Sequence, residues 1–155
     1  MRRTRFMPEE PEAEDSALAE LGRTLDILKP IRRQRLSRAE RELRQEQERL
    51  AALVERLAQG RTALQHQQRE SRQRRADLLD EHRAEAKPVA KVQDWIASEH
   101  AMIGALAHRQ TQLDELAQDH GRQEQRIDSA RQTVIQSQRE VEKLDYLSKN
   151  LGGTL

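Results

Sequence analysis

Histidine is the side chain in this sequence best suited to bind a metal ion, but the five histidines do not form a metal-binding pattern. They are His66, His82, His100, His108 and His120. No two of them lie four residues apart and no Glu-x-x-His sequence occurs, so the helical patterns of zinc proteases and di-iron bundles are absent. The chain has no cysteine, which excludes thiolate ligands and a cysteine nucleophile. The sequence predicts no metal and no cofactor.

Other catalytic patterns are also missing from the sequence. The serines fall mostly on predicted helices, without the glycine elbow that exposes a serine nucleophile. There is no Gly-x-x-x-x-Gly-Lys loop to bind phosphate. We therefore expect a protein that is not an enzyme.

The densest basic segment is RESRQRRADLLDEHR, residues 69–83. Acidic residues are interspersed among its arginines, and it has no aromatic side chain on which a base could stack. A solvated helix surface with charge pairs three and four residues apart explains this pattern better than nucleic-acid binding does. The same arginines are candidates for contact with an acidic protein surface.

The composition favours long helices with a narrow apolar seam over a globular core. Of the 155 residues, 35% are apolar, 35% are charged and 2% are aromatic, and a two-stranded coiled coil needs apolar residues at only two positions in seven. The 28 basic and 27 acidic side chains nearly cancel, so a general attraction to nucleic acid or to an anionic membrane is not expected. No apolar run approaches the roughly 20 residues that span a bilayer, and the basic start lacks the apolar region of a secretory signal. We expect a cytoplasmic protein without direct membrane insertion.

Two apolar seams with a sevenfold repeat follow one another along the chain. The first consists of leucines with one serine, and Ala39, Leu53 and Val54 widen it: Leu36, Leu43, Leu50, Leu57, Leu64, Ser71 and Leu78. The second begins after Pro88, with Glu99 and His120 as polar exceptions and Ile96 and Ile103 beside it: Val92, Leu106, Leu113, Ile127, Val134 and Val141. Two such seams predict an all-α fold, a long antiparallel two-helix coiled-coil hairpin that turns near Pro88.

The pairing in this hairpin follows from the position of its turn. Paired residue numbers should add to about 177, which places Leu64 beside Leu113 and Glu99 opposite Leu78. Arms of some 50 residues would make a rod of roughly 75 Å. The predicted segments are a disordered acidic leader over 1–15, a helix over 16–86 with a kink near Pro30, a helix over 87–151 and a flexible tail over 152–155.

Three features lie at the predicted ends and middle of the hairpin. Leucines between residues 18 and 28 extend past the predicted end of the second helix, so apolar side chains that the hairpin does not cover gather at the end that carries both termini. Trp95 near the turn and Tyr146 at the other end each suit either the core or a contact with a partner. Gly60 and Gly121 weaken the helices within about a turn of each other, which suggests either tolerated small residues or a soft point.

This layout resembles the YscO/FliJ (SctO) family of type III secretion stalk proteins. The resemblance covers roughly residues 20–150 and rests on the segments LDILKPIRRQRLSRAERELRQEQERL and REVEKLDYLSKNL, which lie at the two ends of the hairpin. It implies a non-enzymatic central stalk that binds in the pore of the hexameric secretion ATPase, promotes ATPase assembly and activity, and reaches toward the export gate, a membrane protein with a cytosolic domain. Some family members also escort secretion chaperones. The implied location is cytoplasmic, at the periphery of the inner-membrane export apparatus, and the system is either an injectisome or a flagellum.

The resemblance also assigns residues to partners. The residues implied for ATPase binding lie at the end with both termini: Leu25, Leu28, Ile31, Arg32, Arg33, Leu144, Tyr146, Leu147 and Leu151. Those implied for the export gate lie near the turn: Arg72, Arg75 and Trp95. A second hypothesis is a coiled-coil chaperone or escort for secretion clients, and a third is a homodimer paired through the leucine seam. We expect a monomer, because the chain's own second half can cover the seam.

Overall fold

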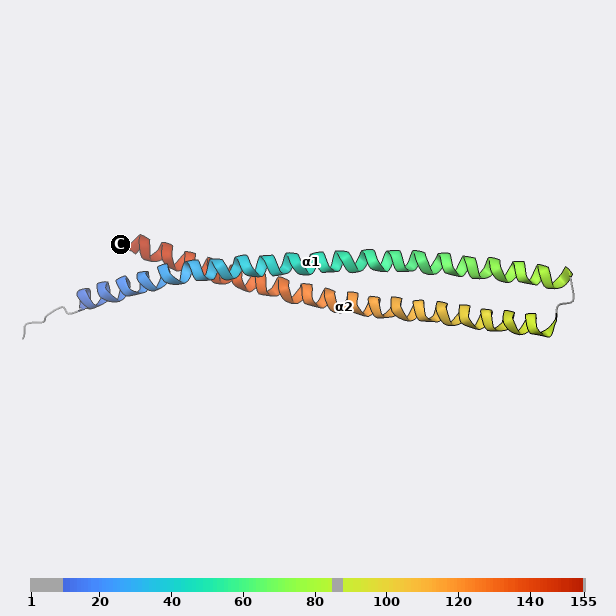
Figure 1. Ribbon diagram of the computed structural model, residues 1–155. Helices are drawn as coiled ribbons and strands as arrows, with labels where there is room; N and C mark the ends of the chain where they lie inside the picture. Colours follow the sequence, from blue (N-terminus) through green and yellow to red (C-terminus); the bar gives the residue numbers. More distant parts are fainter. Residues whose placement is uncertain (1–9, 85–87, 155) are drawn as a thin grey trace, which may run out of the picture. The chain divides into compact units, whose positions relative to one another are not determined.

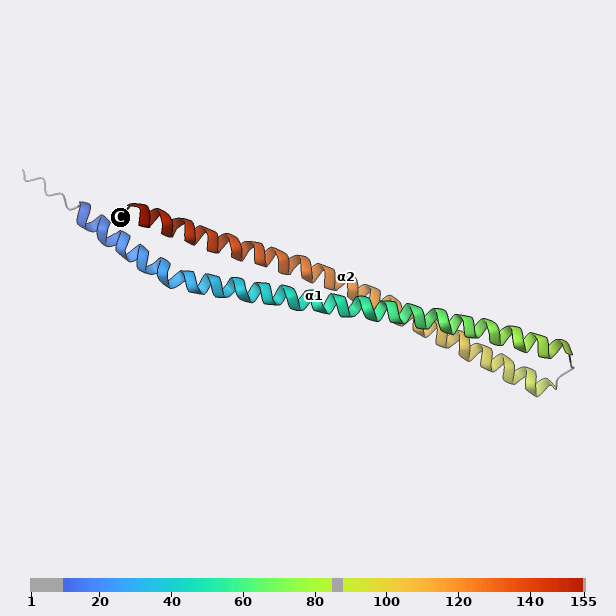
Figure 2. The same cartoon turned by 90° about the horizontal axis from the view of Figure 1, so that it is seen from above.

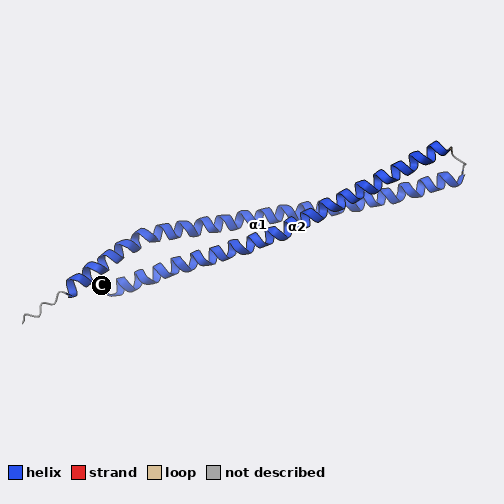
Figure 3. Cartoon of the chain, turned by 90° about the horizontal axis from the view of Figure 1, so that it is seen from below, coloured by secondary structure: helices blue, strands red, loops and turns tan. Residues whose placement is uncertain are grey.

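The chain forms two long helices that pack against each other as an antiparallel coiled-coil hairpin. The computed structural model describes residues 10–84 and 88–154. Helix α1 spans Glu10–Ala84 and helix α2 spans Val89–Thr154 (Figure 1). No strand occurs in these two ranges (Figure 3). The all-α hairpin predicted from the two seams is confirmed.

The helix ends differ from the predicted segment boundaries. Helix α1 begins at Glu10, so residues 10–15 are helical rather than part of a leader. Helix α2 passes through Gly152 and Gly153 and ends at Thr154. Residues 1–9 of the predicted leader, residues 85–87 of the predicted turn and Leu155 of the predicted tail lie outside the described residues.

Two prolines mark special points of the helices. Pro30 lies inside α1, which continues as one helix on both sides of it. Figure 2 shows α1 bending in its blue N-terminal part, which contains Pro30, and a proline inside a helix is an established cause of such a bend. Pro88 directly precedes α2, and its carbonyl oxygen accepts hydrogen bonds from the backbone N–H groups of Lys91 and Val92, at N···O distances of 3.0 and 3.4 Å. Pro88 therefore begins the first turn of the second helix.

The contacts divide the chain into two compact units, which we describe separately. Unit 1 contains residues 1–46 and 127–155, and unit 2 contains residues 47–126. Each unit includes one stretch of α1 and one stretch of α2.

The core of unit 2 is a cluster of leucines from both helices. Leu57, Leu64 and Leu113 are buried and pack together, and Leu106 and Leu116 pack against them. The predicted proximity of Leu64 and Leu113 is confirmed.

Leu113 also explains the glycine at position 60. A Cβ atom built on Gly60 would lie 2.5 Å from Cδ2 of Leu113. This distance is shorter than a nonbonded contact permits, so the absence of a side chain at Gly60 lets Leu113 approach α1 between Leu57 and Leu64. Gly60 is a packing residue, which neither sequence-based explanation of this glycine anticipated.

The polar residues of the seam in unit 2 have partners within the hairpin. Buried Ser71 donates a hydrogen bond from its hydroxyl to the sulfur of Met102, with an O···S distance of 2.8 Å. The Glu99 carboxylate forms an ion pair with Arg75, with 2.7 Å between Oε1 of Glu99 and Nε of Arg75. His120 is half-buried, and its Nδ1 lies 3.4 Å from the Glu124 carboxylate. Glu99 is therefore tied to an arginine on the facing helix, which relieves the cost of placing a carboxylate in the seam.

In α2, the second core position of each heptad is not occupied by the isoleucines that the sequence analysis placed beside the seam. Ile96 and Ile103, predicted beside the seam, are 44% and 50% exposed, whereas Trp95 and Met102 are half-buried. The seam of α2 thus steps by three residues from Val92 and from Glu99, as the alternating spacing of a coiled coil requires. Val54, predicted to widen the first seam, is also exposed.

Unit 1 is built from the outer parts of both seams. Its buried apolar residues come from α1 and α2 in equal number: Leu25, Ala39, Ile127 and Val134. Between Leu25 and Leu36, the half-buried positions of α1 that continue the heptad spacing are Lys29 and Arg32. Their long aliphatic stems can cover apolar surface while the charged groups reach polar partners. The coiled coil thus keeps one heptad register on both sides of Pro30.

Candidate functional site

The residues predicted to bind the ATPase all lie in unit 1, where α1 and α2 come together near their outer ends. We call the surface formed by residues 15–33 of α1 and 144–152 of α2 the terminal-end surface. It contains a hollow of about 390 Å³ between the two helices. The lining combines apolar and small residues with two acidic side chains: Asp15, Leu18, Ala19, Gly22, Leu25, Asp26, Ser148, Leu151 and Gly152.

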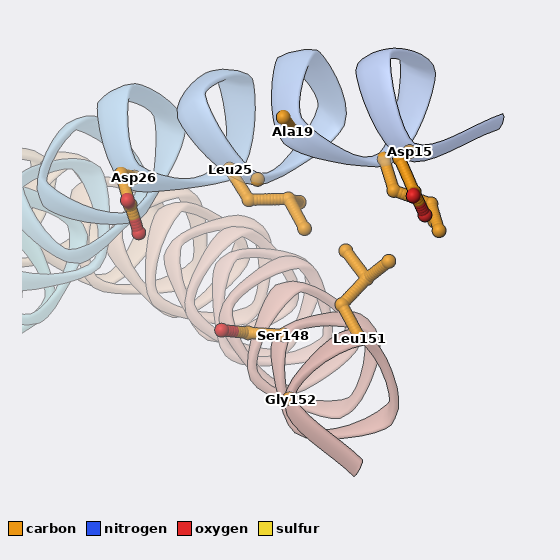
Figure 4. Close-up of a pocket in the computed structure, with 9 residues that line it drawn as sticks. Asp15, Ala19, Leu25, Asp26, Ser148, Leu151 and Gly152 are labelled. Atoms are coloured by element: carbon orange, nitrogen blue, oxygen red, sulfur yellow. The ribbon is translucent and has the colours of Figure 1, made fainter. Parts of the chain in front are cut away.

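Two leucines form the apolar centre of this hollow. Figure 4 shows Leu25 of α1 and Leu151 of α2 pointing into the space between the helices. Leu25 is only 4% exposed and Leu151 is half-buried. The prediction that the leucines of residues 18–28 extend past the end of α2 is wrong, because Leu151 and Gly152 line the same hollow as Leu18. The longer α2, which continues through its glycines, covers this part of α1.

The apolar residues predicted to bind the ATPase fall into a packed set and an exposed set. Leu25 is buried, and three more are half-buried: Leu28, Leu144 and Leu151. Ile31, Tyr146 and Leu147 are exposed, with Tyr146 at 65%. Only the exposed set is open to a partner without separation of the helices.

Two further apolar side chains of this surface are exposed. They are Leu21 and Ile27 of α1, and Ile27 is 64% exposed. Their position in the apolar segment LAELGRTLDIL was the available signal. Leu21 is one of the leucines that the sequence analysis expects the hairpin to leave uncovered, whereas Ile27 was missed.

The two predicted arginines of this surface form ion pairs with α2. Arg32 lies 2.5 Å from the Glu140 carboxylate, and Arg33 lies 3.5 Å from the Asp145 carboxylate. A third link comes from Lys29, whose Nζ donates a hydrogen bond to the Ser148 hydroxyl at 2.5 Å. These contacts hold the two helices together, so Arg32 and Arg33 are already engaged within the chain.

A row of arginines on α1 follows the terminal-end surface. The row consists of Arg35, Arg38 and Arg41. These arginines line a polar hollow of about 660 Å³, and the rest of its lining is Ile31, Gln34, Glu42 and Gln45. Arg38 pairs with Glu42 at 3.2 Å along the same helix. This basic surface adjoins the exposed Ile31, and the spacing of three residues between its arginines was a visible but unused signal in the sequence.

The three residues predicted to contact the export gate lie in unit 2. Arg72 and Arg75 line a smaller hollow of about 210 Å³, and Arg75 also holds Glu99. Trp95 is half-buried, and its ring lies 5.4 Å from the ring of His82 at a tilt of 59°. The structure brings the arginines together, and it gives Trp95 a packing contact rather than a freely exposed position.

The candidate surfaces combine hollows with apolar and charged side chains. Among residues 10–84 and 88–154, there is no group of three or more histidine and acidic side chains placed to hold a metal ion. In the same ranges, neither helix contains a stretch apolar enough to cross a bilayer. The terminal-end surface offers apolar side chains, a hollow with an acidic edge and an adjoining basic row.

Comparisons with known proteins found no matching family model, no matching curated protein and no matching solved structure.

Proposed function

We propose that the chain is the non-enzymatic central stalk of a type III secretion system, as its resemblance to the YscO/FliJ family implies. In this proposal the terminal-end surface binds in the pore of the hexameric secretion ATPase. The observation that carries it is the exposure of Ile31, Tyr146 and Leu147 on a surface to which both helices contribute. Tyrosine is enriched among the hot spots of protein interfaces, and neighbouring exposed apolar side chains mark interaction surfaces.

The proposed contact combines apolar anchors with a basic row. Tyr146 and Leu147 would enter apolar sites on the ATPase, and Arg35, Arg38 and Arg41 would face acidic groups of the pore. The half-buried leucines and the ion pairs of Arg32 and Arg33 have a different task. They hold α1 and α2 together, so that both helices present their exposed side chains at once.

A stalk of this kind needs no chemistry of its own. Two dissimilar helices in a ring of six identical subunits contact different subunits through different side chains. Their binding energy would therefore favour one conformation in some subunits and another in the rest. In this proposal, unequal binding promotes ATPase activity, and simultaneous contact with several subunits promotes ATPase assembly. The link to the export gate, through Arg72, Arg75 and Trp95, is a separate part of the same proposal, and so is a location at the export apparatus.

The test is the ATP hydrolysis rate of the purified secretion ATPase from the same organism, titrated with this protein. We expect the wild-type chain to raise the rate. A Tyr146→Ala and Leu147→Ala double variant should raise it much less, because the two exposed anchors are lost. Ile135→Ala is the matched control, since Ile135 is also an exposed apolar residue of unit 1 but lies outside the terminal-end surface.

Circular dichroism should show equal helicity for all three proteins before the rates are compared. A wild-type chain that leaves the rate unchanged would contradict the stalk proposal and favour the escort hypothesis. Equal stimulation by the double variant and the wild type would show that the ATPase contact lies elsewhere on the chain.

A further inference from the structure

The exposed apolar side chains of unit 2 all follow one flank of the coiled coil. Five large apolar residues of unit 2 are exposed: Val54, Leu79, Val89, Ile96 and Ile103. Four of these directly follow a seam residue in the sequence, namely Leu53, Leu78, Trp95 or Met102. One residue further along a helix is a turn of about 100°. Because the helices are antiparallel, this turn leads from the seam to the same flank on both of them.

On α2 these residues form a second apolar stripe. Val89, Ile96 and Ile103 recur every seven residues, which keeps them on one face of the helix. A hollow of about 210 Å³ lies where this stripe meets α1. Its lining confirms that the flank is shared by the two helices: Gln68, Ser71, Arg72, Arg75, Met102, Ile103 and Leu106.

On α1, the charges on the two flanks of this region differ in sign. Arg72 and Arg75 line the hollow on the apolar flank, and among the described residues Arg72 has no ion-pair partner. On the other flank of α1, the residues directly before the seam positions Ser71 and Leu78 are acidic, namely Glu70 and Asp77. Arg75 is paired with Glu99, so Arg72 gives the apolar flank its uncompensated positive charge, which attracts an acidic partner.

We propose that this flank of unit 2 binds an acidic amphipathic α-helix of a partner protein, which packs beside α1 and α2 as a third strand. A sevenfold apolar stripe matches the spacing of side chains on another helix, as in helix-in-groove recognition. Apolar residues of the incoming helix would cover Ile96 and Ile103, and its carboxylates would pair with Arg72. The proposal does not depend on the ATPase contact, which uses residues of unit 1, but it shares Arg72 and Arg75 with the proposed export-gate contact.

A second copy of the chain fits this flank poorly. A symmetric dimer places the same surface of both copies in contact, so the basic flank of one copy would meet the basic flank of the other. Like charges at such a contact repel. The basic character of the flank thus selects a partner with acidic side chains over self-association.

The binding test uses two labelled synthetic helices of about 21 residues, each with leucine at the two core positions of three heptads. The remaining charged positions carry glutamate in one peptide and lysine in the other. Fluorescence anisotropy at about 0.1 M salt measures their affinity for the full chain, with long-range charge effects partly screened. We expect the glutamate peptide to bind at least about tenfold more tightly than the lysine peptide.

Two variants locate the site. The double variant Ile96→Gln and Ile103→Gln should lower the affinity for the glutamate peptide by about tenfold or more, because both apolar contacts are lost. The control Ile135→Gln, an equally exposed isoleucine of unit 1, should leave its affinity unchanged. Arg72→Glu should lower the affinity for the glutamate peptide and raise the affinity for the lysine peptide. A loss of folding would not produce this reversal.

Several outcomes would overturn the proposal. They are absence of binding by the glutamate peptide, equal affinities for both peptides, or unchanged affinity in the Ile96 and Ile103 variant. Light scattering provides a further check on the partner. A wild-type dimer that Ile96→Gln with Ile103→Gln converts to a monomer would show that a second copy covers the flank.

Discussion

Gly60 and Gly121 provide the sharpest test of the packing in unit 2, because the same substitution should have different effects at the two positions. Both glycines lie in α1 or α2 within unit 2. A Cβ atom on Gly121 meets nothing within 4 Å, whereas one on Gly60 lies 2.5 Å from Cδ2 and 3.6 Å from Cγ of Leu113. Leu113 is 7% exposed and packs between Leu57 and Leu64, so it has little room to move.

The expected free energies follow from these distances. Glycine to alanine inside a helix contributes about 1 kcal/mol through helix propensity. At Gly121 nothing opposes this gain, so Gly121→Ala should stabilise unit 2 by about 1 kcal/mol. At Gly60 the new methyl group must displace Leu113, and overpacking of this kind costs about 1–3 kcal/mol. Gly60→Ala should therefore be neutral or destabilising by up to about 2 kcal/mol.

The assay is urea unfolding followed by circular dichroism, supported by hydrogen exchange of amides in residues 50–70 and 105–125. Gly104→Ala is a second control, since a Cβ atom at Gly104 also meets nothing within 4 Å. It should behave like Gly121→Ala. In a double-mutant cycle, Leu113→Ala should cost less in the Gly60→Ala background than alone, because the smaller side chain removes the clash. Stabilisation by Gly60→Ala equal to that by Gly121→Ala would refute the close contact with Leu113.

Four further substitutions test the polar side chains and the proline. Arg75→Gln should reduce the free energy of unfolding by about 0.5–1 kcal/mol, because it leaves the Glu99 carboxylate without its ion pair, while Arg72→Gln should have almost no effect in the same urea titration. Pro30→Ala should stabilise α1 by up to about 3 kcal/mol, and slower hydrogen exchange between residues 26 and 34 would be the evidence for it. Ser71→Ala should change the free energy of unfolding by less than about 1.5 kcal/mol, since it removes one buried hydrogen bond to sulfur and little volume, and a larger loss would show that this bond fixes the seam.

The hairpin was predictable because the leucines that recur every seven residues in its seam are unambiguous. Leu57, Leu64 and Leu113 are apolar, recur with the sevenfold spacing, and are buried as predicted. The second core position of each heptad was harder to assign from the sequence. Ile96 and Ile103 are more apolar than their neighbours, so the sequence analysis placed them beside the seam, but coiled-coil geometry assigns the inner position to the residue three after Glu99 rather than four.

The end of the hairpin was predicted only in part for a similar reason. Lys29 and Arg32 were not expected in the seam, since their charged groups obscure their aliphatic stems. The exposed Tyr146 and Leu147 were named from the sequence, whereas the burial of Leu25 depends on how far α2 extends. The Gly60 contact with Leu113 joins residues far apart in the chain. No local sequence pattern encodes such a contact, so only the structure shows it.

The order of the cross-helix contacts also has a kinetic consequence. The bond between Ser71 and Met102 closes a loop of 31 residues, and the bond between Lys29 and Ser148 closes one of 119. The entropy lost on closing a loop grows with the logarithm of its length, so contacts near the connection form at the lower cost. Once they have formed, each later pair adds only a few residues to an already closed loop. We expect the hairpin to fold as a zipper from the connection toward the termini, with unit 2 ordered before the ends of α1 and α2 meet.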